Sequence, residues 1–481
     1  MHLAFQILPG HAPRRHHFQD FFTHQQLPAR PRWALANPCH TRWRLTSTDS
    51  ISPDAAAAAT AVDDDTADSD IHFMRRCLEL AQRARPSPNP PVGCVIVEPD
   101  TARVLGEGYH ERAGMPHAEV NALRACSGCS DAGRLADRLL HTEWGRAHGW
   151  TVPLGAARGA HVYVSLEPCN HYGRTPPCTE ALIQAQVARV VIGVLDPDPR
   201  TAGGGAERLR RAGIAVQVGV LAAECATLYE GFTHRVRYQK PFGIYKYAMT
   251  LDGKIATATG DARWVSGSAS RRLVHALRDR CDAVVVGGNT VRRDDPELTV
   301  RDLPAGVTRV NAPQPLRVVL TRQLARLVRD APDAKLWNTA RARTVVVTAH
   351  ARETEAEEAV RYLRLRGVEV VSFAPTASTV PQALAWLYHV GCCTVLWECG
   401  GALAAEALRC GALHQFLVFV AGKIVGGAGA PTPISTDWQV SSMRDAWPLD
   451  IRRVQRIEPE HDVLITAYPA APAATAPTDA P

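Results

Sequence analysis

The hydrophobic positions along the chain divide it into ordered and unordered stretches. Residues 1–69 show no sustained periodicity and residues 469–481 are rich in Ala, Pro and Thr, so we expect both ends to be disordered. Between them, short apolar runs that suit buried strands alternate with segments whose apolar residues recur at helical spacing. The alternation predicts an α/β protein with two domains, 70–221 and 241–468, joined by a linker helix over 222–240.

In the first domain, a helix is predicted from Ile71, with Asp70 as its cap, because apolar residues follow at helical spacing. The Pro-rich stretch 86–91 ends it. Strands are expected over 92–97, 103–109, 161–166, 189–195 and 214–218, with helices starting at His117, over 175–185 and over 207–212. These elements predict an α/β sandwich.

The second domain is predicted to begin at Phe242 and to continue as alternating strands and helices. The strands are expected over 283–286, 316–320, 344–347, 368–372, 394–398 and 415–420, and the helices over 270–280, 354–365, 381–389 and 402–410. Such alternation is typical of a doubly wound, mostly parallel sheet.

Composition narrows the functional classes. In 481 residues the formal net charge is only +6 and is not gathered into a basic block, which argues against nucleic-acid binding and leaves small anionic substrates open. No run approaches the apolar length of a membrane span. Thirteen cysteines, an odd number at irregular spacing, favour reduced thiols and a metal site over a disulfide framework.

Reduced thiols indicate a reducing compartment, and we expect the cytoplasm. Up to Thr48 the only acidic residue is Asp20 while arginines recur, which leaves a transit peptide and an organelle location as the alternative. A simple tail, or a true start near Met74, explains the same stretch equally well. Cys126 and Cys129 resemble a redox or metal pair, but without a second pair we interpret them as loop cysteines.

A candidate metal site is formed by residues near the starts of the second and third predicted helices of the first domain. His117, Cys169 and Cys178 offer one imidazole and two thiolates, a ligand set suited to tetrahedral zinc with a fourth position for water. Glu119 follows His117 by two residues, so it can lie beside that water and carry its proton as general acid/base. A closed structural zinc site is the alternative, but it would need a fourth protein ligand and would leave Glu119 without a role.

The spacing resembles the zinc nucleobase-deaminase signature H-x-E…P-C-x-x-C, with eight residues between the cysteines in place of two. The longer loop, 170–177, together with 88–93 and 196–199, is similar to the bifunctional riboflavin-biosynthesis deaminase-reductases. The resemblance extends from about residue 70 to about 465. It implies a cytidine-deaminase-like three-layer sandwich, followed by a dihydrofolate-reductase-like domain that uses NADPH.

The second domain has no standard dinucleotide or P-loop motif, but Gly400 and Gly401 lie between a predicted strand and a predicted helix, where a backbone can approach a phosphate. The stretches 250–256, 264–267 and 287–301 resemble the reductase half of the family. The residues that the resemblance places around NADPH are Ala248, Trp264, Thr290, Asp294, Gly400, Gly401, Ala402, Leu403, Ala404, Ala405 and Glu406.

The resemblance also implies two sets of substrate-binding residues. The deaminase set is Asn89, His110, His171 and Arg174, with Lys246 reaching in from the reductase domain or from a neighbouring subunit, and the reductase set is Arg278, Leu298, Arg301 and Glu398. His110 and His171 could equally be loop histidines without a ligand, although the adjacent metal ligands favour a site role for His171. The alternative for Arg278 and Arg301 is a solvated helix face. Ala262 stands where family members carry a substrate-contacting Ser, so that contact is expected to be lost.

The implied reactions belong to riboflavin biosynthesis. The first domain would deaminate 2,5-diamino-6-(5-phosphoribosylamino)pyrimidin-4-one, and the second would reduce the ribosyl group of the product with NADPH. The expected partner is therefore a small phosphorylated pyrimidine, with no nucleic acid and no membrane, in a homo-oligomer. The alternatives are a nucleic-acid base deaminase with an accessory nucleotide-binding domain, and a non-enzymatic role for one of the domains.

Overall fold

The computed structural model describes residues 64–126, 156–173, 175–199, 201–304, 313–349, 354–373, 378–435 and 438–470. Most of the disorder predicted for the two ends falls on residues 1–63 and 471–481, which lie outside this part, as do Cys129 and Arg174. The prediction is wrong for residues 64–69, which are helical, and for Pro469, which ends a strand. Within the described ranges, no helix is both long enough and apolar enough to cross a bilayer.

The first domain is built on a five-stranded sheet with the order β2-β1-β3-β4-β5. β1 is antiparallel to both β2 and β3, whereas β3, β4 and β5 are mutually parallel. The elements are α1 (Asp64–Ala81), β1 (Gly93–Val97), β2 (Val104–Tyr109), α2 (Ala118–Ala125), β3 (His161–Leu166), α4 (Cys178–Gln184), β4 (Arg189–Val194), α5 (Gly204–Arg211), β5 (Ala215–Val218), α6 (Ala222–Leu228) and α7 (Glu230–Tyr238).

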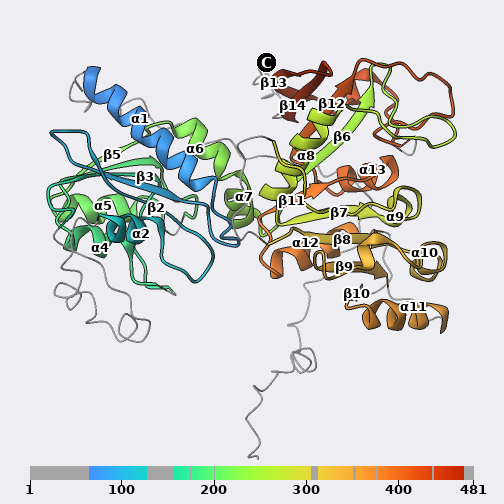
Figure 1. Cartoon of the computed structure of the whole chain (residues 1–481), viewed down its shortest axis with the longest axis horizontal. Coiled ribbons are helices and arrows are strands. Elements are labelled where there is room, and N and C mark those ends of the chain that lie inside the picture. Colours follow the sequence, from blue (N-terminus) through green and yellow to red (C-terminus); the bar gives the residue numbers. More distant parts are fainter. Residues whose placement is uncertain are drawn as a thin grey trace, which may run out of the picture. The chain divides into compact units, whose positions relative to one another are not determined.

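Successive residues of β1 enter different cores because side chains alternate across a strand. Cys94 and Ile96 pack with residues of α2, α4 and α5, whereas Val95 and Val97 pack with residues of α1 and α6. Figure 1 shows α1 and α6 on one face of this sheet and α2, α4 and α5 on the other. The predicted three-layer sandwich is confirmed.

Two local predictions in this domain are wrong. The first helix begins at Asp64, before Ile71, and Asp70 lies inside it, where its carboxylate binds Arg189 at 2.6 Å and accepts from the Tyr163 hydroxyl. The linker is two helices, α6 and α7, because Tyr229 interrupts the helix between them; its buried hydroxyl donates to Ser165 at 2.6 Å. In both places a long-range polar contact decides the local structure.

The second domain is built on a nine-stranded sheet with the order β10-β9-β8-β7-β11-β6-β12-β14-β13. The elements are β6 (Phe242–Thr250), α8 (Ser268–Arg280), β7 (Ala283–Gly287), α9 (Gly288–Asp294), β8 (Leu316–Thr321), α10 (Leu324–Asp330), η3 (Lys335–Trp337), β9 (Thr344–Ala349), α11 (Thr354–Leu365), β10 (Glu369–Phe373), α12 (Val380–His389), β11 (Thr394–Trp397), α13 (Gly401–Arg409), β12 (Gln415–Ala421), η4 (Met443–Asp445), β13 (Leu449–Ile457) and β14 (Asp462–Pro469).

The seven strands from β10 to β12 are parallel, and β14 and β13 add an antiparallel edge. Apolar residues of these strands pack against α12 and α13 on one face, and against α8, α10 and α11 on the other. The predicted doubly wound sheet is confirmed. The short helices α9 and α10 and the strands β13 and β14 escaped the sequence analysis.

Candidate functional sites

The three predicted metal ligands meet in the first domain. His117 is the N-cap of α2 and Cys178 is the first residue of α4, while Cys169 lies in the loop after β3. The His117 Nδ1 atom is 3.5 Å from the Cys169 Sγ atom and 3.3 Å from the Cys178 Sγ atom. When one nitrogen and one sulfur bind the same tetrahedral zinc ion, these two atoms are expected to lie about 3.5 Å apart. The donor set therefore fits zinc in both chemistry and spacing.

The charges within the cluster favour a thiolate. The Cys178 thiol and the His117 ring lower the pKa of Cys169, and the Cys178 backbone N–H donates to the Cys169 sulfur at 3.3 Å. A thiolate is the form that binds zinc. Among the described residues, these three form the only group of His, Cys or acidic side chains close enough together to hold a metal ion.

Glu119 is buried beside this cluster, with only 3% of its surface exposed. Burial and then the Cys169 thiolate raise the pKa of Glu119 to about 7. It is not one of the three clustered ligands. A carboxyl group with a pKa near neutrality can both accept and return a proton, as a general acid/base must.

Thr175 contacts the far side of the metal-binding ring, since its Oγ1 atom lies 3.4 Å from the His117 Nε2 atom. Groups that orient a ligating imidazole in this way typically contribute 10- to 100-fold to metal affinity. We therefore expect Thr175→Val, which keeps the side-chain shape, to weaken zinc binding by roughly 10- to 100-fold. Competition with a chelating dye measures this, and unchanged affinity would show that Thr175 does not orient the ring.

Two predicted substrate residues lie next to the cluster. The His110 ring centroid is 4.9 Å from that of His117. The His110 Nδ1 atom is 3.0 Å from the Pro116 carbonyl, and the His110 Nε2 atom is 3.0 Å from the Asn89 amide nitrogen. Because the carbonyl can only accept and the amide nitrogen can only donate, Nδ1 of His110 carries the proton. Burial lowers the pKa of His110 to about 4, which keeps the ring neutral. His171 is exposed on the ligand loop.

The residues assigned to NADPH gather at one edge of the second sheet. Ala248 is on β6, Thr290 and Asp294 are on α9 after β7, and Gly400 is the N-cap of α13 after β11. β7, β11 and β6 are parallel neighbours, so their carboxyl ends share that edge, where ligands of such sheets bind. Trp264, in the segment between β6 and α8, is 63% exposed.

The turn at Gly400 and Gly401 has the features of a phosphate cradle. A Cβ atom on Gly400 would meet nothing within 4 Å, so the space above it is open, whereas one on Gly401 would lie 2.8 Å from the Ser435 backbone nitrogen. The second position thus excludes a side chain, and the first allows a ligand to approach the backbone at the start of α13. The turn fits a dinucleotide phosphate.

Two of the predicted reductase substrate residues, Arg278 and Glu398, form a buried ion pair. Arg278 binds Glu398 in a two-pronged arrangement, with Nε–Oε1 at 2.5 Å and Nη2–Oε2 at 2.9 Å, and both side chains are 11% exposed. Burial alone would raise the pKa of Glu398, but Arg278 and then Lys246 outweigh it and lower it to about 2. The structure thus places Lys246 beside Glu398 in the second domain. The contact of Lys246 with the deaminase substrate, made from this chain or from a neighbouring subunit, stays a prediction.

Leu298 and Arg301 lie on the segment between α9 and β8. Leu298 is 2% exposed and adopts a positive φ of 53°, whereas the Arg301 side chain is 53% exposed. The described contacts of Arg301 are long and involve one nitrogen, Nη1, at 3.5 Å from Thr299 Oγ1 and 3.6 Å from Glu297 Oε2. A guanidinium has five N–H donors, so Arg301 retains capacity for an anion. Ala262 is partly buried in the segment before α8.

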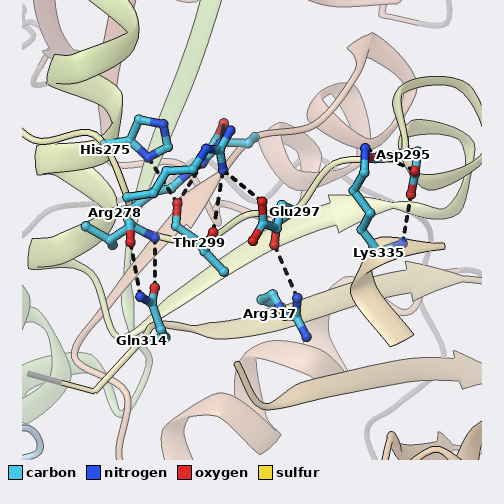
Figure 2. Close-up of polar contacts among 11 residues, drawn as sticks. His275, Arg278, Asp295, Glu297, Thr299, Gln314, Arg317 and Lys335 are labelled. Atoms are coloured by element: carbon cyan, nitrogen blue, oxygen red, sulfur yellow. Dashed lines mark hydrogen bonds and ion pairs between the residues drawn. The ribbon is translucent and has the colours of Figure 1, made fainter. Parts of the chain in front are cut away.

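Three residues that were not predicted as part of the site hold this segment in place. His275, Gln314 and Arg317 lie around the segment (Figure 2) and contact the backbone of Thr299, Val300 and Glu297, respectively. No local pattern marks Gln314, because its partners are backbone groups that the sequence does not distinguish. The one sequence feature that sets Arg317 apart is its position as the single charged residue of a strand, Leu316–Thr321, that is otherwise almost entirely apolar.

Two family models match the chain, one for each domain. Residues 67–194 match the cytidine and deoxycytidylate deaminase zinc-binding region, and residues 241–459 match the RibD C-terminal domain. The riboflavin biosynthesis protein RibD of Synechocystis is 45% identical over 403 residues, which cover 83% of this chain and 96% of that protein. A maize chloroplastic protein, riboflavin biosynthesis protein PYRR, is 35% identical over 92% of this chain and 66% of its own length.

Solved structures show the same arrangement of domains along the chain. A Thermotoga maritima protein, described as a diaminohydroxyphosphoribosylaminopyrimidine deaminase and 5-amino-6-(5-phosphoribosylamino)uracil reductase, is 32% identical and has a TM-score of 0.66. The match covers 84% of this chain and 100% of that one. RibD of Acinetobacter baumannii gives a TM-score of 0.65 at 31% identity, with the same coverage.

Proposed function

Because the chain belongs to the bifunctional riboflavin-biosynthesis deaminase-reductases, we propose how its own residues divide the two reactions. The protein is both a hydrolase and an oxidoreductase, and it uses zinc in the first domain and NADPH in the second. The observation that supports the division best is the meeting of His117, Cys169 and Cys178 beside a buried acid. Separate assays of ammonia release and NADPH oxidation on one preparation test it.

In the first domain, we assign the proton transfers to Glu119. Bound zinc supplies activation of water at neutral pH. Glu119 takes a proton from the attacking water and delivers it to the departing ring amine, so that ammonia leaves and a carbonyl replaces the amine. Its burial and its pKa near neutrality support this role. The substrate we propose is 2,5-diamino-6-(5-phosphoribosylamino)pyrimidin-4-one.

The same pocket offers groups that can hold the pyrimidine. Asn89 and His110 are fixed against one another next to the metal ligands, which orders two polar groups at the edge of the site. Fixed donors and acceptors of this kind read the edge of a heterocycle. We propose that His171, exposed on the ligand loop, and Arg174 contact the rest of the substrate.

In the second domain, NADPH supplies hydride to the ribosyl C1′ of the deaminated pyrimidine, and the chain supplies position and charge. The Gly400–Gly401 turn and α13 hold the cofactor phosphates, while Trp264, Thr290 and Asp294 border the rest of the cofactor. Glu398, kept ionised by Arg278 and Lys246, can accept hydrogen bonds from ribosyl hydroxyls. Arg301, exposed and with unused donors, is proposed to bind the substrate phosphate.

Replacing Arg301 should affect substrate binding more than turnover. A charge-assisted hydrogen bond is worth about 1.5–3 kcal/mol, so Arg301→Ala should raise the KM for the phosphorylated pyrimidine about tenfold or more, with a smaller change in kcat. Steady-state NADPH oxidation with the deaminated substrate measures both constants. Arg322 is exposed just after β8 and is not assigned to the site, so Arg322→Ala is the control. An unchanged KM for Arg301→Ala would remove Arg301 from the phosphate site.

We propose that residues 70–221 and 241–468 are the catalytic domains, extended at the start by the first turns of α1, that 222–240 links them, and that the chain forms a homo-oligomer. A cytoplasmic location is proposed. Import into an organelle is the alternative, since the related maize and Arabidopsis proteins are described as chloroplastic.

A further inference from the structure

The segment 295–301 carries predicted substrate contacts without belonging to a helix or strand. Buried backbone N–H and C=O groups need partners, and a segment outside helices and sheets must find them elsewhere. Leu298, Thr299 and Val300 are all buried. The groups that satisfy this backbone therefore also decide where Leu298 and Arg301 point.

Gln314 pairs with both backbone groups of Val300, the residue immediately before Arg301. The Gln314 Oε1 atom accepts from the Val300 N–H at 2.7 Å, and its Nε2 atom donates to the Val300 carbonyl at 3.1 Å. This is the pairing that a neighbouring strand would provide, made here by one side-chain amide. Gln314 stands just before β8, a strand with neighbours on both sides in the sheet, so its own position is well fixed.

Other contacts fix the earlier part of the segment independently of Gln314. The Thr299 carbonyl accepts from His275 at 3.0 Å and from Arg278 at 3.2 Å, and the Glu297 carbonyl accepts from Arg317 at 3.2 Å (Figure 2). Arg317 is fully buried and donates further to the carbonyls of Leu336, Asn338 and Ala342. Loss of Gln314 should therefore release Val300 and Arg301 while the rest of the segment stays anchored.

We propose that Gln314 is a positioning residue for the reductase reaction, which holds the Val300 backbone so that the Arg301 guanidinium faces the substrate phosphate. The inference rests on the proposed phosphate-binding role of Arg301. Binding a phosphate through two parallel N–H donors demands a defined orientation of the guanidinium plane. A backbone held at both its N–H and its C=O supplies that orientation.

The test uses Gln314→Met in the full zinc-loaded chain, because methionine keeps the length of the side chain but removes both hydrogen bonds. We expect the KM for the deaminated, phosphorylated pyrimidine to rise about tenfold, with a smaller change in kcat. Gln314→Glu, which places a carboxylate oxygen against the Val300 carbonyl where the amide nitrogen now donates, should not restore the KM. Ammonia release by the same preparations should be unchanged, and the control Gln455→Met, on the exposed strand β13, should change neither activity.

The decisive comparison is the double variant. If Gln314 acts through Arg301, Gln314→Met combined with Arg301→Ala should have the KM of Arg301→Ala alone. Multiplication of the two effects would overturn the proposal, because it would show that Gln314 acts independently. An unchanged KM for Gln314→Met beside a raised KM for Arg301→Ala would also overturn it and leave the role of Arg301 intact. An unchanged KM for Arg301→Ala would instead reject that proposed role itself.

Discussion

The Glu119→Gln variant should bind zinc as tightly as the parent protein and release ammonia at least a thousandfold more slowly, within the range of about 10²–10⁴ attributed to a general acid/base. Glutamine has nearly the shape of glutamate but neither accepts nor returns a proton. The metal ligands His117, Cys169 and Cys178 are untouched by the change. Zinc content by atomic spectroscopy and ammonia release by a coupled assay measure the two halves of this expectation.

Glu180→Gln is the matched control, since Glu180 lies on α4 close to Cys178 but pairs with Arg208 on the domain surface. We expect it to leave ammonia release nearly unchanged. The reductase activity of Glu119→Gln, measured with the deaminated substrate, should equal that of the parent. Ammonia release by Glu119→Gln at the parental rate would remove Glu119 from the chemistry.

The second large effect is expected in the other domain, at the buried pair of Arg278 and Glu398. Breaking a buried ion pair by removing one partner typically costs about 3–5 kcal/mol, because the remaining charge is left uncompensated. Glu398→Gln should therefore lower the free energy of unfolding by about 3 kcal/mol and reduce NADPH oxidation severely. Glu369→Gln, which removes an exposed pair with Arg343, should change stability little.

The pH dependence of this effect has a definite sign. The pKa of Glu398 is lowered in the folded protein from 4.5 to about 2, so its stabilising contribution is fully present above pH 4.5 and is lost as the pH falls toward 2. The difference in unfolding free energy between parent and Glu398→Gln should shrink across that range. Denaturant titrations followed by tryptophan fluorescence at several pH values measure it, since the neighbouring Trp397 is buried. If the difference in unfolding free energy between the parent and Glu398→Gln did not change with pH, then Arg278 and Lys246 would not hold Glu398 in its ionised form.

The metal site could be predicted because each ligand is marked by the residues next to it in the sequence. His117 and Glu119 are close in sequence, and each of the two predicted helix starts places a ligand, as the structure shows for α2 and α4. The strand and helix pattern was equally readable wherever strands are buried on both faces. β13 escaped detection because eight of its nine residues are exposed, which leaves no hydrophobic alternation to detect.

Long-range partners explain what sequence reasoning missed. Asp70 looks like a helix cap, but Arg189, which is 119 residues away, takes its carboxylate. Gln314 carries no signature at all, because its partner is the backbone of Val300. In each case the deciding contact joins residues that the sequence keeps apart.

The most direct test of two separate sites on one chain gives the Glu119→Gln variant the diaminopyrimidine substrate together with NADPH, and then the deaminated substrate with NADPH. We expect no NADPH oxidation with the first substrate, because the reductase receives no product, and the parental rate with the second. The parent should release ammonia and oxidise NADPH in equal amounts. Oxidation of NADPH by the variant on the diaminopyrimidine, or none on the deaminated substrate, would contradict the account.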